Sequence, residues 1–248
     1  MRAVRIGSLR LNVSAQDESL ALVRDRLASA HAATASFGFL NPHVYNLSAA
    51  DPRVAVFLEC CQAVCLDGIG AMLAGSLLNR SSLPRAAMHH VFDACVAAGL
   101  LSGRVVLLGL NAADNARALA SLELAAPEAD FVACHHGFRT DQDYAAILRE
   151  HDDADFVLVG MGTPRSEHVL LWAGEICRHA LCWHVGGGTL RQWAGTKRRA
   201  PALVSRLGLE WLHRVAYEPQ TRSRYATGIP SFAGRVLIDS LRRRGGAR

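Results

Sequence analysis

The sequence predicts an α/β protein with a mostly parallel sheet, flanking helices and a basic helical appendage at its C-terminus. Short apolar runs begin near residues 104, 130, 156 and 180, and helical patterns separate them at intervals of about 25 residues. That rhythm is typical of βαβ units with right-handed crossovers, which build parallel sheets. The run Phe156–Gly160 also has no polar break, as expected of a strand that is buried on both faces.

The first hundred residues are expected to mix short strands with helices. Asn41-Pro42 and Asp51-Pro52 each end one segment and open a helix, because proline suits the first turn of a helix. The expected elements are a strand or hairpin arm at Arg5–Val13, a helix at Gln16–Leu27, a strand at Ser36–Leu40, helices at His43–Ser48 and Val54–Ala63, a strand at Val64–Leu66, and helices at Met72–Leu78 and Met88–Leu101, the last ended by Gly103.

The second half alternates more regularly. Thr163 is expected to cap the helix that runs through Cys177, with Pro164 at its first position, and the glycine run Gly186–Gly188 closes the last strand. The expected elements are strands at Arg104–Gly109, Asp130–Cys134, Phe156–Gly160 and Ala180–Val185, helices at Asn111–Leu122 and Asp143–Glu150, and a helical tail that includes Leu203–Val215 and Phe232–Arg243.

Composition indicates a folded globular protein of a reducing, cytoplasmic compartment. The chain has 248 residues, of which 50% are hydrophobic, enough for a substantial core. No run approaches the roughly 18–20 apolar residues of a membrane span, and the N-terminus has no long apolar block of the kind that precedes secretion. The seven cysteines are odd in number and form no C-x-x-C pair, so we expect buried free thiols rather than disulfides or a zinc site.

Charge is distributed unevenly along the chain. From Arg191 onward there are 13 basic and 3 acidic residues, whereas the preceding part has 14 basic and 19 acidic residues. We therefore expect an α/β body, residues 1–200, followed by a basic helical appendage, residues 201–248. Nucleic acid, a membrane surface or a polyanionic ligand would each suit such an appendage.

Glycine turns at strand ends are candidate ligand contacts. Gly160-Met161-Gly162 lets backbone approach a ligand closely, and Glu167 falls in the first turn of the next helix, where the helix dipole favours an acid. This arrangement suits a phosphate-bearing ligand, although most such turns bind nothing. Asp67 is a candidate general base, with a turn-forming or helix-cap role as the alternative. Asn41 could hydrogen-bond a sugar, but as a turn residue before proline it needs no function.

Sequence patterns typical of metal sites and of other catalytic sites are either absent from this chain or misplaced in it. Asp153 and Asp155 have D-x-D spacing, but they precede a strand, whereas metal-binding acids would follow one. The adjacent pairs His89-His90 and His135-His136 point apart on a helix or strand, so we expect no two-histidine metal site. No G-x-G-x-x-G, Walker or G-x-S-x-G pattern occurs. We therefore expect neither a metal nor a cofactor.

A series of short motifs points to one family. The most specific are Gly162–Glu167, Arg199-Ala200-Pro201 and Glu210–Arg214. Further motifs extend the pattern over nearly the whole chain, namely Asn41-Pro42, Leu66–Gly70, Leu107–Gly109, His136–Phe138, Val159–Met161, Val185–Gly188, Ala194-Gly195, Gly208-Leu209 and Glu218-Pro219. In type and order these motifs resemble the WecG/TagA/CpsF glycosyltransferases, also called glycosyltransferase family 26.

The resemblance implies an inverting hexosyltransferase that moves a sugar from a UDP-sugar to a polyprenyl-diphosphate-linked sugar, in cell-surface or exopolysaccharide biosynthesis. It implies a Rossmann-like body without the D-x-D metal site, and an appendage that binds the membrane and helps to close the active site. We therefore expect a peripheral protein on the inner face of the cell membrane. We expect no nucleic-acid partner, and homo-oligomer formation is left open.

The resemblance also assigns candidate site residues. The catalytic candidates are Asp67, as the base, and Asn41. Candidates for the nucleotide-sugar are Gly68, Gly109, His136, Gly137, Gly160, Gly162, Pro164, Glu167, Gly186, Gly187 and Arg191. Arginine forks match diphosphate oxygens where no metal is present. The candidates for the diphosphate or the lipid acceptor are therefore Arg199, Arg214, Arg222 and Arg224.

Three parts of the sequence depart from the family pattern. Many members have threonine where this chain has Phe39, Phe-Asp where it has Leu190-Arg191, and glutamine where it has Ser166. The donor is therefore left between N-acetylmannosamine and a hexose such as glucose. Trp211 and Leu212 are interpreted either as packing residues or as residues at a lipid interface.

A second hypothesis comes from a different class of protein. The chain could be a non-catalytic nucleotide- or anion-binding module whose basic face binds nucleic acid, with salt-sensitive affinity. The tail lacks the interleaved aromatic residues and the recognisable motif expected of such a face. The glycosyltransferase hypothesis therefore leads.

Overall fold

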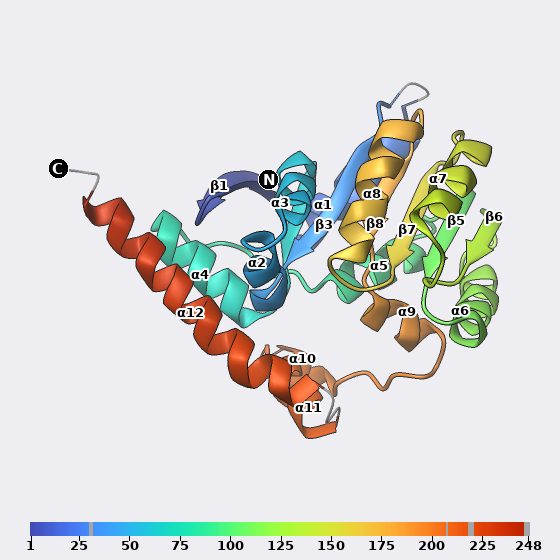
Figure 1. Ribbon diagram of the computed structural model, residues 1–248. Coiled ribbons are helices and arrows are strands. Elements are labelled where there is room, and N and C mark those ends of the chain that lie inside the picture. The colour runs from blue at the N-terminus through green and yellow to red at the C-terminus, as the bar shows by residue number, and fades with distance from the viewer. Residues whose placement is uncertain (30–31, 207, 218–220, 246–248) are drawn as a thin grey trace.

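The computed structural model describes residues 1–29, 32–206, 208–217 and 221–245 and has an α/β fold (Figure 1). Within these residues, one sheet of eight strands has the order β1-β2-β4-β3-β8-β7-β5-β6. The strands are β1 (Arg2–Ile6), β2 (Leu9–Val13), β3 (Ala35–Leu40), β4 (Ala63–Leu66), β5 (Gly103–Gly109), β6 (Ala129–His135), β7 (Phe156–Gly160) and β8 (Leu181–His184). Among these described strands, only the β1–β2 hairpin is antiparallel, which confirms the predicted mostly parallel sheet.

Helices cover both faces of this sheet. They are α1 (Gln16–Leu27), α2 (Pro42–Ser48), α3 (Pro52–Cys60), α4 (Ile69–Asn79), α5 (Met88–Ala97), α6 (Ala112–Ala125), α7 (Asp141–Glu150), α8 (Arg165–Ile176), α9 (Gly187–Trp193), α10 (Ala202–Arg206), α11 (Glu210–Tyr217) and α12 (Arg222–Gly245). Helices α3, α8 and α7 are neighbours in one row, and α1, α5, α9 and α6 are neighbours in another. Every residue of β4, β7 and β8 is buried, which confirms the burial predicted for Phe156–Gly160.

Two predicted boundaries near residue 100 are wrong. Helix α5 ends at Ala97 rather than at Leu101, because Gly99 takes a positive φ of 65° that ends the helical backbone. Gly103, which was expected to end that helix, instead begins β5. Glycine marks a break in the pattern at both positions, but the pattern does not say which glycine the chain uses.

The segments after β7 and β8 also differ from the prediction. Helix α8 begins at Arg165 with Pro164 as its N-cap, so Thr163 does not cap it. The hydroxyl of Thr163 donates instead to Glu167. The glycine run after β8 does not only close the strand, because Gly187 is already the first residue of α9.

Aromatic side chains and cysteines fill the core. The ring of Trp183 makes edge contacts with Phe37 and Phe92, at centroid distances of 5.6 and 5.5 Å. All seven cysteines are free, and Cys61, Cys65, Cys95, Cys177 and Cys182 are buried. Burial raises the pKa of the Cys65 thiol to about 11, so that thiol is inert at neutral pH. The predicted free core thiols are confirmed at these five positions.

The C-terminal segment packs against the body through α12. The Tyr45 hydroxyl of α2 donates to the Asp239 carboxylate at 2.6 Å, and Phe232 and Val236 are buried. Figure 1 shows α12 running alongside α4 and past α2. The helix begins ten residues before the predicted Phe232, at Arg222, and contains Pro230. None of the described helices combines the length and apolar character that a membrane span requires.

Candidate active site

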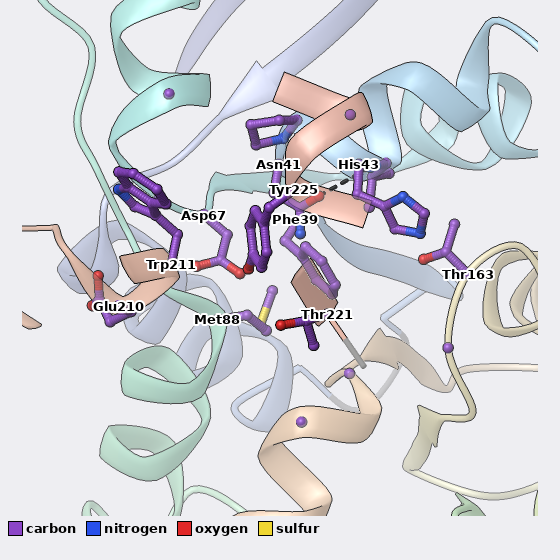
Figure 2. Close-up of a pocket in the computed structure, with 18 of the residues that line it drawn as sticks. Phe39, Asn41, His43, Asp67, Met88, Thr163, Glu210, Trp211, Thr221 and Tyr225 are labelled. Carbon is purple, nitrogen blue, oxygen red and sulfur yellow. Dashed lines mark hydrogen bonds between the residues drawn. The ribbon is translucent and has the colours of Figure 1, made fainter. Parts of the chain in front are cut away.

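A large cavity opens at the carboxyl ends of the parallel strands and is the candidate active site (Figure 2). Its volume is about 1040 Å³, at the upper limit of typical small-ligand sites. Open α/β sheets bind ligands at this edge, where the loops after different strands converge. The strand ends contribute Asn41 after β3, Asp67 after β4, Leu110 after β5, Gly137 after β6, Gly160 at the end of β7 and Val185 after β8.

Asp67 follows β4 directly and faces into this cavity. Its N–H donates to the carbonyl of Leu40 at 2.9 Å, which continues the β3–β4 pairing by one residue. Gly68 then takes a φ of +94° and turns the chain into α4, so the positive end of the helix dipole lies beside the carboxylate. Figure 2 shows the Asp67 carboxylate beside the ring of Tyr225, which comes from α12. A carboxylate at this position suits a general base.

Asn41 lies near Asp67, and its side chain has a structural partner. Its Oδ1 accepts the Val44 N–H at 2.9 Å and caps α2 (Figure 2). The residue also lines the cavity. Asn41 therefore has a structural role as a helix cap, and the hydrogen bond to a sugar that the sequence suggested stays a prediction.

Four of the seven predicted glycines fall into two groups. Gly68 and Gly162 line the cavity with φ of +94°, and a Cβ at either would meet nothing within 4 Å. By contrast, a Cβ at Gly160 would lie 2.5 Å from Leu190 Cδ1, and a Cβ at Gly109 would lie 2.5 Å from the Gly160 carbonyl oxygen. The first group leaves open space at the cavity wall. The second group allows β5, β7 and α9 to pack closely, and Gly109 itself is outside the lining. Gly137, Gly186 and Gly187 also line the cavity.

Two cationic side chains line the cavity near the turn that opens α9. One is the predicted Arg191, and the other is Lys197, which the sequence did not single out. A Cβ at Gly188 would lie 3.4 Å from Lys197 Nζ, so the ammonium group lies over that turn. Cations beside backbone N–H groups suit a diphosphate. Lys197 belongs to the basic run after Gly195, and this run is the sequence feature from which its place at the cavity could have been suspected.

The tail arginines occupy other places. Arg199 binds Asp93, with 3.1 Å between Nη2 and Oδ1, and does not line the cavity. Arg222 donates to two carbonyls near the end of α11, at 2.9 and 3.2 Å, and is also outside the lining. The side chains of Arg214 and Arg224 lie outside the described residues. The positive charge described at the cavity therefore comes from the segment around α9 rather than from Arg199 or Arg222.

Glu167 and His184 form a buried polar pair next to the cavity. Their side chains are 0% and 1% exposed, and Glu167 Oε1 lies 3.6 Å from His184 Nδ1. The same oxygen accepts the Thr163 hydroxyl at 2.8 Å. Burial lowers the pKa of His184 and the Glu167 carboxylate opposes this shift, so the neutral ring is favoured. Glu167 is not among the lining residues, whereas the two residues that it contacts are.

Two further predicted residues support turns and do not line the cavity. His136 Nδ1 accepts the Phe138 N–H at 3.2 Å, within the turn after β6. Pro164 is the N-cap of α8. Neither belongs to the cavity lining, although their neighbours Gly137 and Thr163 do.

Aromatic residues from distant parts of the chain form part of the wall. Phe39 lies in the centre of the view in Figure 2, and its ring centroid is 4.6 Å from that of His184. Trp211 of α11 and Tyr225 of α12 both line the cavity, with 6.4 Å between their centroids. Trp211 thus contributes to the cavity wall. Sequence analysis did not identify Tyr225 as a lining residue, because its place depends on how α12 folds back over the strand ends.

Among the described residues, no three histidine, cysteine, aspartate or glutamate side chains converge into a set that could hold a metal ion. Asp155, from the D-x-D pair, has a structural partner at the other end of the sheet. Its carboxylate accepts the Arg104 N–H at 2.8 Å, at the start of β5.

Comparisons with known proteins agree on one family. Two relatives from Staphylococcus aureus, strains MRSA252 and NCTC 8325 / PS 47, are each 26% identical over 198 residues, which cover 79% of this chain and 77% of theirs. Both are named N-acetylglucosaminyldiphosphoundecaprenol N-acetyl-beta-D-mannosaminyltransferase. The family described as "Glycosyl transferase WecG/TagA/CpsF family" matches residues 4–246. The chain therefore belongs to the WecG/TagA/CpsF family and is a glycosyltransferase.

Proposed function

We propose that this enzyme is an inverting glycosyltransferase that transfers a sugar from a UDP-sugar to a polyprenyl-diphosphate-linked sugar without a metal ion, with Asp67 as the general base. One observation carries the proposal. The Asp67 carboxylate lies at the carboxyl end of β4, in a cavity that also contains glycine turns and two cationic side chains. Membership of a glycosyltransferase family overturns the alternative of a non-catalytic binding module.

The proposed reaction is a single displacement at the anomeric carbon. Asp67 accepts the proton of the acceptor hydroxyl while the hydroxyl oxygen attacks that carbon, and such a positioned base contributes about 10²–10⁴-fold to the rate. The bond from the anomeric carbon to the β-phosphate oxygen breaks, and UDP leaves with the electron pair. Arg191, Lys197 and the backbone N–H groups of the glycine turns stabilise the charge that develops on the diphosphate.

The donor is either a hexose such as glucose or N-acetylmannosamine. The names of the S. aureus relatives support N-acetylmannosamine as donor and N-acetylglucosaminyldiphosphoundecaprenol as acceptor. Phe39 and Arg191, which depart from the family pattern, both line the cavity and favour a different donor. Ser166, the third departure, is buried, and its Oγ accepts the Met161 N–H at 3.1 Å, so it supports the turn after β7.

We place the reaction at the inner face of the cell membrane, within cell-surface or exopolysaccharide biosynthesis. The basic surplus after Arg191 supports this location, because anionic headgroups attract basic residues by about 1 kcal/mol each. The enzyme is then peripheral, bound through its C-terminal segment. The side chains of Arg243 and Arg244, at the end of that segment, lie outside the described residues.

The test is transfer of radiolabelled sugar from UDP-glucose and UDP-N-acetylmannosamine to a polyprenyl-diphosphate-linked N-acetylglucosamine, with and without EDTA. Asp67→Asn should lower kcat by about 10²–10⁴-fold, whereas Asp25→Asn, at an exposed position on α1, should leave it unchanged. Full activity of Asp67→Asn would refute the role of the base. Loss of transfer in EDTA would refute metal independence, and a product with the donor's anomeric configuration would refute inversion.

A further inference from the structure

The cavity continues from the Asp67 region into an apolar groove between α4 and α12. On α4 its lining includes Leu73 and Leu77, and on α12 it includes Ile229, Ala233 and Leu237. Leu77 and Leu237 are each 60% exposed. Such large aliphatic side chains at the surface of a continuous depression mark a contact site for an apolar ligand or partner.

The groove residues on α12 follow the period of one helix face. Positions 229, 232, 233, 236, 237 and 240 are spaced so that they form a single stripe. From Ile229 to Ser240 this stripe is roughly 16 Å long, at about 1.5 Å per residue. None of the described side chains that α4 and α12 contribute to the lining is charged.

The groove is a fixed feature because α12 is anchored to α2. Asp239 accepts the Tyr45 hydroxyl at 2.6 Å, and the Phe232 ring packs edge-on against Tyr45 at 5.2 Å. The Asn46 amide also donates to the Gly228 carbonyl at 2.8 Å. The contacts with α2 therefore hold α12 beside α4, and the exposed leucines form the walls of a preformed groove.

We propose that this groove binds the first isoprene units of the acceptor's polyprenyl chain, with the diphosphate and the sugar nearer Asp67. The inference rests on the proposed acceptor class. A peptide would need hydrogen-bonding groups, yet helical backbone is satisfied internally and Ser240 contributes the only hydroxyl from the described stripe on α12. The uncharged lining and its continuity with the Asp67 cavity favour a hydrocarbon chain that is attached to the reacting group.

The test measures binding of prenyl diphosphates of increasing chain length, namely geranyl, farnesyl and geranylgeranyl diphosphate, by titration calorimetry. Wild-type affinity should rise with chain length. Leu237→Glu and Leu77→Glu should bind geranylgeranyl diphosphate roughly tenfold more weakly or worse, because a carboxylate would be buried against hydrocarbon. Ile238→Glu is the matched control, since Ile238 is 49% exposed on the same helix but does not line the groove. It should keep the wild-type dependence on chain length.

Several results would overturn the inference. Equal affinity of the wild type for all three prenyl diphosphates would show that the groove does not bind the isoprene chain. An equal loss in Ile238→Glu and Leu237→Glu would assign these residues to a general membrane surface. A wild-type dimer that becomes a monomer in Leu237→Glu, as measured by light scattering, would assign the groove to a second copy of the chain. Because binding is measured without sugar transfer, failure of the proposed reaction is distinguished from failure of this groove.

Discussion

The buried carboxylate of Glu167 provides a test of how the structure next to the cavity is held together. Glu167→Ala removes the acceptor of the Thr163 hydroxyl, which lies at 2.8 Å, and the acid that faces His184 Nδ1 at 3.6 Å. The matched control is Glu175→Ala, at an exposed position on the same helix, α8. The two substitutions delete the same side chain in different surroundings.

The expected loss of stability follows from these contacts. A hydrogen bond to a charged acceptor contributes about 1.5–3 kcal/mol. Because burial favours the neutral His184 ring, removing Glu167 leaves no uncompensated charge there. Glu167→Ala should therefore lower the free energy of unfolding by about 1.5–3 kcal/mol. In a protein of this size, Tm should then fall by roughly 3–12 °C. Glu175→Ala should stay within about 0.5 kcal/mol of the wild type.

Urea unfolding followed by circular dichroism measures both variants. Glu167→Gln adds a second comparison, because it retains an acceptor for Thr163 and should be less destabilised than Glu167→Ala. If Glu167→Ala were as stable as Glu175→Ala, the buried pair would not support the structure. If its sole effect were a higher KM for the donor, Glu167 would instead be the nucleotide contact that the sequence suggested.

Three further predictions concern packing, pH and charge. Gly160→Ala should cost about 1–3 kcal/mol, because its Cβ would lie 2.5 Å from a side-chain carbon of α9, whereas Gly174→Ala, which meets nothing within 4 Å, should be neutral or stabilising in urea unfolding. Burial lowers the pKa of His184 from its usual value of 6.5. Below pH 6.5 the unfolded chain therefore binds more protons than the folded chain, and the free energy of unfolding should fall as the pH falls, by up to about 1.4 kcal/mol per pH unit. His184→Phe should remove this part of the slope in urea midpoints measured from about pH 7 to 5, and an unchanged slope would contradict the assignment. Arg191→Gln should raise the KM for the donor by about tenfold or more. Arg199→Gln, at a residue outside the cavity lining, should leave this KM unchanged. Equal effects of the two substitutions in steady-state kinetics would refute this prediction.

The positions of the strands and the turns that follow them were predictable from the sequence. Runs such as Phe156–Gly160 specify buried strands through their apolar character alone, and Asp67-Gly68 marks the end of another. Because parallel strands end at one edge of the sheet, the rhythm of the elements also predicts that these turns converge. Asp67, Gly162 and Gly187 meet at the cavity for that reason.

The functions of individual side chains within those turns were less predictable. Glu167 and Gly160 belong to the most recognisable stretch of the chain, yet the structure buries the first against His184 and packs the second against Leu190. A local sequence pattern indicates that an acid or a glycine is needed at a position, but it does not indicate which atoms from other elements surround that residue.

By itself, the sequence determined the fold class, the family and the strand ends that form the site, because backbone preference and hydrophobic period are local properties of a chain. The tertiary structure alone decided that Lys197 and Tyr225 line the cavity, while Arg199 binds Asp93 outside it. It also decided that α12 lies beside α4 and extends the cavity into an apolar groove. The Arg199–Asp93 pair and the packing of α12 beside α4 join segments more than a hundred residues apart. Burial and partner choice are properties of such contacts rather than of any single segment.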